Sequence, residues 1–401
     1  MAKIFPFKGI TFNDDLEGQI GKLLCPPFDV IEEELKNSLY ELSEFNVIRL
    51  ENGKSFDSDN QSDNKYKRAS AFFQKLLNEK ILIQKSRDYF FILEENFQSK
   101  NSIITRRSLI ANVELHEYNE KIIFPHEKTR KKQRSDRLEL MKSTEANFSS
   151  IMCTVEDQDQ NLYKFLAKEA NGVPKYQGII PDMHEFKLWE IEDDKKISYL
   201  SELIDSENIY IADGHHRYET ALEFNKIQSD QSSKRMMNII SLKDEGLLLL
   251  GYHRAIAGLD NEKLNNLINE LKEVFDFKST KWNDSFFQWN YDDGHKILMT
   301  DNKSSTILTP KNKNNSIYQI LHQVFSSIFS ESEIIDYVRY EHSSESMKEK
   351  LHSNELQVGF FMNALSKAFF LNTVSQGKLL PPKSTLFYPK LPTGLVIQYL
   401  K

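Results

Sequence analysis

The chain has 401 residues, of which 39% are apolar and 28% charged, and its formal net charge is −7. This length and composition suffice for a sizeable core in two or three domains, or in one domain with large insertions. A mildly acidic chain is not a general binder of DNA or of anionic membranes, because its long-range field repels polyanions. We therefore expect neither nucleic acid nor a membrane among its partners.

The two cysteines, Cys25 and Cys153, are too few for a disulfide framework and lie at no metal-binding spacing. A reduced, cytoplasmic setting is the expectation. The first residues lack the apolar core of a signal peptide, and no window approaches the roughly 18 apolar residues of a membrane span. The sequence does not define an oligomeric state.

The expected secondary structure alternates between helices and strands. Helices at 31–44 and 66–80 precede two strands, 81–97 and 103–115, that are expected to pair antiparallel. A helix at 135–146 has Ser135 as its candidate N-cap. The chain then continues with strand 151–155, helix 161–170, strand 184–191, helix 197–204, strand 208–212 and a helix from His215.

The second half of the chain is expected to hold a separate lobe. Strands 236–242 and 247–252 are predicted to pair through the turn Asp244-Glu245-Gly246. A helix from Asn261 and strands near 296–300 and 305–308 follow. We predict an α+β fold with mixed sheets. A site-bearing core would span residues 1–258 and a C-terminal lobe residues 259–401, with the segment 380–400 packing back on the core.

The segment Asp213-Gly214-His215-His216-Arg217 carries the main chemical signal, because it links a β-branched strand to a helix. Gly214 permits a tight turn and the close approach of a ligand. The first N–H groups of a helix are unpaired, and the helix dipole favours an anion there. Arg217 adds a planar fork of donors, and the two histidines add donors and acid–base groups. We expect a nucleotide phosphate at residues 214–217.

Asp213 and the histidines also have simpler interpretations. A carboxylate beside a phosphate repels it, unless Asp213 caps the helix, binds Mg²⁺ or takes a proton. His215 and His216 could be ordinary helix-start residues, and Arg217 a solvated base. The strand–turn–helix context favours the functional interpretation.

Three more segments are rigid and polar. Asp29 follows Pro26-Pro27-Phe28 and is a candidate general base or metal ligand, or else a turn cap. His126 and Glu127 follow Pro125 and are candidate catalytic groups. The basic residues after them are predicted to be mostly solvated: Lys128, Arg130, Lys131, Lys132, Arg134 and Arg137.

The third segment is a proline-framed loop near the C-terminal end. Its ammonium and hydroxyl groups suit phosphate or carboxylate: Lys383, Ser384, Thr385 and Lys390. The alternative is an ordinary ordered tail.

These segments, in this order, resemble the family classed as domain of unknown function 1015. The matching stretches are Pro26-Pro27-Phe28-Asp29-Val30, Pro125-His126-Glu127-Lys128-Thr129 with Asp136-Arg137, the Asp213 motif, and Pro381-Pro382-Lys383-Ser384-Thr385 with Phe387-Tyr388-Pro389-Lys390. Cys25 and Phe28 depart from the alanine and tyrosine usual in the family. The family's naming by gene neighbourhood, as SerB-cluster proteins, points towards serine metabolism.

The Asp-Gly-His-His-Arg core also resembles the nucleotide motif of the ParB and sulfiredoxin superfamily. That superfamily includes partition-protein CTPases, sulfiredoxin and a free-serine kinase, whose members bind nucleotide phosphates at this helix start. The resemblance implies a ParB/sulfiredoxin-like core elaborated by insertions.

The first hypothesis is an enzyme that transfers a phosphoryl group from ADP or ATP, with or without Mg²⁺, to a small metabolite such as serine. Phosphoryl transfer needs mainly positioning and charge stabilisation. Lys383 and Lys390 would stabilise charge, and Asp29 or Glu127 would activate the hydroxyl. The candidate catalytic residues are Asp29, His126, Glu127, Asp213 and His216.

Two alternatives remain open. One is a nucleotide-gated factor that binds DNA or a protein, as partition proteins do. The other is a metal-dependent hydrolase, which requires the histidines to converge. A zinc-protease motif is excluded because Arg130 stands four residues after His126, and the sequence assigns no metal ligands.

Overall fold

The computed structural model describes residues 1–99, 102–129, 131–181, 183–228, 233–281, 295–301, 303–312 and 315–400, without the side chains of 131–133. It divides into a larger unit, Met1–Leu248 with Pro389–Lys401, and a smaller unit, Leu249–Tyr388. The division expected from the sequence lies at residue 258. Within the described residues, no helix is long and apolar enough to cross a membrane.

The larger unit is built on a mixed sheet in which β6–β11 and β8–β12 are parallel pairs and the remaining pairs are antiparallel. The strand order is β6-β11-β8-β12-β5-β4-β10-β9, with β1 added on β5. Its strands are β1 (Ile4–Phe5), β4 (Phe90–Ser99), β5 (Ser102–Glu114), β6 (Ile123–Phe124), β8 (Ile151–Val155), β9 (Tyr176–Ile179), β10 (Glu185–Ile191), β11 (Ile209–Asp213) and β12 (Lys234–Ser241). Shorter pairs join β2 (Ile10–Phe12) to β3 (Leu82–Gln84) and β7 (Ala146–Asn147) to β21 (Gln398–Tyr399).

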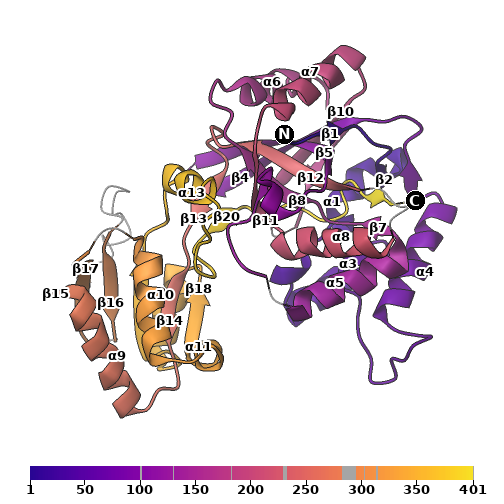
Figure 1. Cartoon of the computed structure of the whole chain (residues 1–401). Helices are drawn as coiled ribbons and strands as arrows, with labels where there is room; N and C mark the ends of the chain where they lie inside the picture. The colour runs from indigo at the N-terminus through magenta and orange to yellow at the C-terminus, as the bar shows by residue number, and fades with distance from the viewer. Residues whose placement is uncertain are drawn as a thin grey trace. The chain divides into compact units, whose positions relative to one another are not determined.

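Helices cover both sides of this sheet, with α6 and α7 on one side and α5 and α8 on the other (Figure 1). The main core lies where buried strand residues such as Ile211 meet Leu166 of α6 and Leu200 of α7. A second cluster joins α5 to α8 through Met141 and Phe224. The helices are α1 (Ile20–Leu23), α2 (Glu33–Leu42), α3 (Ile48–Glu51), α4 (Lys65–Asn78), α5 (Lys131–Thr144), α6 (Asn161–Glu169), α7 (Asp194–Asp205) and α8 (His215–Ile227).

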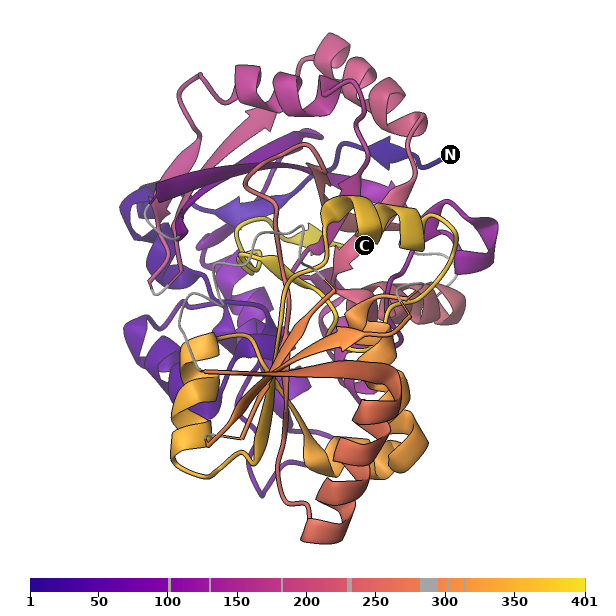
Figure 2. The same cartoon turned by 90° about the vertical axis from the view of Figure 1, so that its left-hand side faces the viewer.

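The smaller unit holds its own antiparallel sheet in the order β15-β17-β16-β19-β14-β18. Helices lie on both faces of that sheet (Figure 2). The elements are β14 (His253–Ile256), α9 (Asn261–Val274), β15 (Phe275–Thr280), β16 (Ile297–Thr300), β17 (Ser305–Pro310), α10 (Ile317–Ile328), α11 (Glu331–Tyr337), β18 (Val338–Glu341), α12 (Ser344–His352), β19 (Val358–Met362) and α13 (Lys367–Val374). The fold class is α+β, as predicted.

Two local predictions were wrong. Ser135 is not an N-cap, because α5 already begins at Lys131; the lysines, glutamine and arginine before Ser135 are good helix formers and extend the helix. Strand 247–252 does not pair with β12, because β5 and β8 occupy both edges of β12. Instead β13 (Leu248–Leu250) pairs with β20 (Leu386–Tyr388).

Candidate functional site

The turn between β11 and α8 is built around Gly214, as the sequence predicts. Gly214 has φ +95° and is the N-cap of α8, a backbone conformation that side chains with a Cβ rarely adopt. A Cβ at this position would lie 3.0 Å from Nε of Arg217. The glycine is therefore needed both for the turn and for the guanidinium group that folds back over it.

Asp213 does not cap the helix, contrary to one expected role, because two cations hold its carboxylate. Arg217 donates a hydrogen bond of 2.7 Å to Oδ2, and the ammonium group of Lys390 contacts Oδ1. Burial alone would raise the pKa of Asp213, but the charges of Lys390 and Arg217 outweigh it and keep the pKa well below its usual range. The carboxylate is therefore ionised and does not present an uncompensated charge to a phosphate.

Lys390 also lies 3.3 Å from Oδ2 of Asp29, which joins the Pro26-Pro27 segment to the turn. A buried ion cluster fixes the position of Lys390. Arg106 donates 2.6 Å hydrogen bonds to the Pro389 carbonyl and to Glu95, and Glu95 contacts His184 at 2.8 Å. This cluster sets the backbone directly before Lys390.

His126 and His215 form a buried pair behind the turn, with ring centroids 4.4 Å apart. Nδ1 of His126 bonds to the Ile211 carbonyl at 2.7 Å, and the His126 N–H donates to Nε2 of His215 at 3.2 Å. Each ring therefore carries its proton on Nδ1, because a carbonyl only accepts and a backbone N–H only donates. Burial lowers the pKa of both histidines, and for His215 the neighbouring His126 adds to it. Both rings are neutral at neutral pH and hold the Pro125 segment against the turn.

Glu127 lies beside this pair, with Oε1 3.7 Å from Nδ1 of His215. Two residues on, Thr129 donates a 2.5 Å hydrogen bond to Glu219 of α8. Glu219 also accepts a hydrogen bond of 2.8 Å from Arg134. These contacts tie the predicted Pro125–Thr129 segment to α8. Arg130 and the side chains of Lys131 and Lys132 lie outside the described residues.

A second ion cluster lies next to Arg217. Arg137 donates to Asp136 at 2.5 Å and to the Glu51 carbonyl at 2.8 Å, and its guanidinium stacks 4.2 Å from the Phe28 ring. Arg137, Glu51 and Arg217 all line a cavity of about 20 Å³, which has room for about one water. No sequence pattern indicates Glu51, because its contact with Arg137 forms only in the folded chain.

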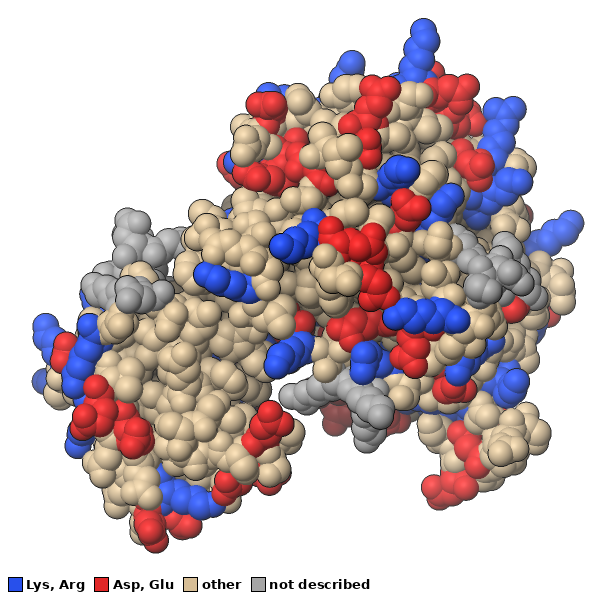
Figure 3. All heavy atoms as spheres, viewed as in Figure 1, with Lys and Arg blue, Asp and Glu red and all other residues tan. Residues whose placement is uncertain are grey.

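Acidic and basic side chains are interspersed on the face drawn in Figure 3. No group of three or more histidine, cysteine, aspartate and glutamate side chains in the described part of the chain is arranged to hold a metal ion. His126 and His215 do converge, but they do so as a hydrogen-bonded pair.

The remaining predicted site residues belong to the smaller unit. Lys383 has φ +57°, its ammonium lies 5.2 Å from the Tyr252 ring, and Ser384 donates to the Pro381 carbonyl at 2.7 Å. Thr385 is adjacent in the same loop. Lys390, by contrast, belongs to the larger unit.

Residues 4–356 match the family described as protein of unknown function, DUF1015. The chain belongs to this family. The match ends before Lys390, so the residue that neutralises Asp213 lies beyond the matched region of this DUF1015 member. No curated protein matches the chain.

Among solved structures, a free serine kinase in complex with AMP is similar at 13% identity, over 73% of this chain and 91% of that one, with TM-score 0.41. A conserved hypothetical protein from Pyrococcus furiosus is similar at 14% identity, over 72% and 95%, with TM-score 0.39. SbnI from Staphylococcus aureus, truncated at its C-terminus, is similar at 10% identity, over 70% and 84%, with TM-score 0.41. The chemistry of the DUF1015 chain therefore has to be inferred from its own site.

Proposed function

We propose that this DUF1015 protein is a nucleotide-binding phosphotransferase, with the phosphate of ADP or ATP on residues 214–217. The convergence of Arg217 and Lys390 at the N-terminus of α8 supports this proposal most. In addition, Nε of Arg217 is a buried donor without a hydrogen-bond partner among the described residues. A buried, unpaired donor is costly unless a ligand satisfies it, and a helix N-terminus favours an anion.

In the proposed reaction, the hydroxyl oxygen of a small acceptor forms a bond to the terminal phosphorus of the nucleotide. The bond from that phosphorus to the bridging oxygen breaks. The leaving group is AMP when ADP is the donor and ADP when ATP is the donor. Arg217 and Lys390 would stabilise the charge that develops on the phosphoryl oxygens. His216, at the first turn of α8, would add a donor.

The hydroxyl proton needs a carboxylate acceptor. Asp29 is the better candidate, because its side chain is 29% exposed and lies at the ammonium group of Lys390. Glu127 is the second candidate. Mg²⁺ uses one or two carboxylates together with substrate phosphates. Asp29 would be the carboxylate that holds it, because both oxygens of Asp213 already bind Arg217 and Lys390.

Three parts of the sequence interpretation stay predictions. They are the phosphate-binding role of Lys383, Ser384 and Thr385, the likeness of the core to ParB and sulfiredoxin proteins, and serine as the acceptor.

Calorimetric titration with ADP and ATP, with and without Mg²⁺, tests the nucleotide site. Arg217→Ala should weaken binding about tenfold or more, because a charge-assisted hydrogen bond is lost. Lys128→Ala, which removes an exposed lysine nearby, should leave the affinity unchanged. Thermal unfolding of both variants separates a binding defect from misfolding.

Phosphoryl transfer is then measured by ³¹P NMR with L-serine as the first acceptor. Equal losses in the two variants, or no nucleotide binding by the natural chain, would show that the turn is not a nucleotide site. Nucleotide binding without any product would restrict the protein to a binding role.

A further inference from the structure

A second pocket in the larger unit combines aromatic rings with cationic side chains. Its volume is about 250 Å³, and it lies between α2, α3, α4 and the loop that joins α3 to α4. Tyr40, Phe56 and Phe72 supply the rings, and the cations are Arg49, Lys54, Lys65 and Arg68. The lining, all of it in the described part of the chain, contains no carboxylate.

Two of the cations stack on the same ring. The guanidinium of Arg49 lies 4.4 Å from the centroid of Tyr40, and the ammonium of Lys54 lies 4.7 Å from it. Arg49 donates to the carbonyls of Tyr40 and Ser43, both at 2.7 Å. No ion pair of Lys54 occurs among the described residues. Among the described residues, therefore, neither Arg49 nor Lys54 forms an ion pair with a carboxylate.

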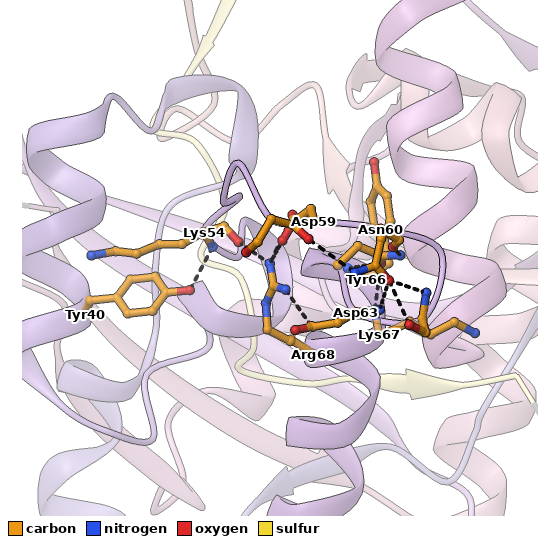
Figure 4. A network of polar contacts seen from close by, with 11 residues as sticks. Tyr40, Lys54, Asp59, Asn60, Asp63, Tyr66, Lys67 and Arg68 are labelled. Carbon is orange, nitrogen blue, oxygen red and sulfur yellow. Dashed lines mark hydrogen bonds and ion pairs between the residues drawn. The ribbon is translucent and has the colours of Figure 1, made fainter.

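The loop that forms the pocket wall is fixed in place. Arg68 of α4 binds Asp59 at 2.8 Å, Asp63 at 2.6 Å and the Lys54 carbonyl at 2.9 Å (Figure 4). The Lys54 N–H donates to the Tyr40 hydroxyl at 3.0 Å. These bonds hold the backbone of Lys54 in place in the absence of a ligand, and preorganisation of this kind reduces the entropic cost of binding.

Phe56 lies at the pocket although it is 54% exposed, with the guanidinium of Arg68 4.8 Å from its ring. An aromatic ring left in water on a fixed loop gains free energy when a flat apolar group covers it. The cations on the same pocket favour a negative charge on that group.

We propose that this pocket binds a small aromatic carboxylate, with its ring against Phe56 and Tyr40 and its carboxylate at Lys54 and Arg49. The volume is sufficient for one or two fused rings and falls just below the roughly 300 Å³ at which drug-sized pockets begin. A bare inorganic anion would leave the rings exposed. A neutral aromatic would leave Arg49 and Lys54 without a counter-charge, whereas Lys65 and Arg68 already pair with Asp136 and with Asp59 and Asp63. This site is separate from residues 214–217 and does not rest on the proposed phosphotransferase function.

The test uses the full chain and three probes: indole-3-carboxylate, the uncharged indole-3-carboxamide, and acetate, which has no ring. Titration should show saturable binding of the carboxylate, at least about tenfold weaker binding of the carboxamide, and no binding of acetate. Equal binding of carboxylate and carboxamide, or no binding of any probe, would overturn the proposal.

Variants locate the site. Lys54→Met should weaken the binding of indole-3-carboxylate about tenfold, and Phe56→Ala should weaken its binding several-fold. Lys67→Met, which changes an exposed lysine of α4 that does not line the pocket, should have no effect. Lys54→Met and Phe56→Ala alter side chains that are only partly buried or exposed, so their unfolding temperatures should match that of the natural chain. Affinities of both variants equal to that of Lys67→Met would place the ligand elsewhere.

Discussion

Lys390 donates a hydrogen bond to the carboxylate of Asp213 across 177 residues of sequence, and the same ammonium group lies 3.3 Å from Asp29. The pair connects the C-terminal segment to the start of α8. Side-chain exposure is 14% for Lys390 and 17% for Asp213, so the two charges interact with little screening by water.

Lys390→Met should therefore lower the free energy of unfolding by about 1–3 kcal/mol, because Asp213 keeps Arg217 but loses its second cation. Urea denaturation at pH 7 measures the change. Lys128→Met, at an exposed lysine, is the matched control and should stay within about 0.5 kcal/mol of the natural chain. A Lys390→Met protein as stable as the control would mean that the ion pair contributes nothing to the fold.

Asp136 should make the stability of the protein depend on pH in the acidic range. Burial would raise its pKa, but Arg137 and Lys65 outweigh that effect and lower the pKa from 3.8 to about 2. A carboxyl group whose pKa is lowered by folding stabilises the fold at any pH above its pKa in the unfolded chain. This contribution is lost as the pH falls through the pKa of the folded state. The shift corresponds to roughly 2 kcal/mol.

Asp136→Asn should consequently be less stable than the natural chain by about 2 kcal/mol at pH 7. That difference should shrink as the pH falls from about 4 to about 2. The measurement is chemical denaturation over this pH range, with Glu139→Gln on the same helix as the control. A difference that stays constant with pH would contradict the lowered pKa.

The site could be predicted from the sequence only where its geometry is local. The strand, the Gly214 turn and the helix from His215 follow from neighbouring residues, and the structure has all three. Asp213 and Asp136 each have one local ionic partner, Arg217 and Arg137. Their second partners could not be predicted, because Lys390 and Lys65 reach them only after the chain has folded. The carboxylate of Asp213 could cap the helix in isolation, but the two cations bind it instead.

The buried histidine pair gives a prediction about protonation. His126 and His215 should both carry a single ring proton, on Nδ1, at pH 7. Nδ1 of His126 donates to a carbonyl, and Nε2 of His215 accepts from a backbone N–H. ¹⁵N NMR of histidine-labelled protein distinguishes this form from the Nε2–H form and from imidazolium. Both rings should remain neutral below pH 6.5, because burial lowers their pKa values, and that of His215 well below the usual value. Imidazolium signals from either ring at pH 6 would show that the rings are solvated.

The last prediction separates a nucleotide site from general binding of polyanions. The chain carries a net charge of −7, and its basic and acidic side chains are interspersed on the face in Figure 3. Contacts of exposed lysines and arginines with DNA release counterions, so affinity that arises from them falls steeply as the salt concentration rises. A phosphate held by buried Arg217 and by backbone N–H groups should be less sensitive, because buried charges are screened less.

Two titrations at about 50 mM and about 200 mM salt test this difference, one with a duplex DNA and one with ADP. Over this range the DNA affinity should fall by at least about tenfold for even a few phosphate contacts, while the ADP affinity should change by less than that. Arg217→Ala should reduce the ADP affinity and leave the weak DNA binding unchanged, since Arg217 is buried whereas duplex DNA would contact exposed side chains. Tight DNA binding at about 200 mM salt without any binding of ADP would instead favour the DNA-associated alternative.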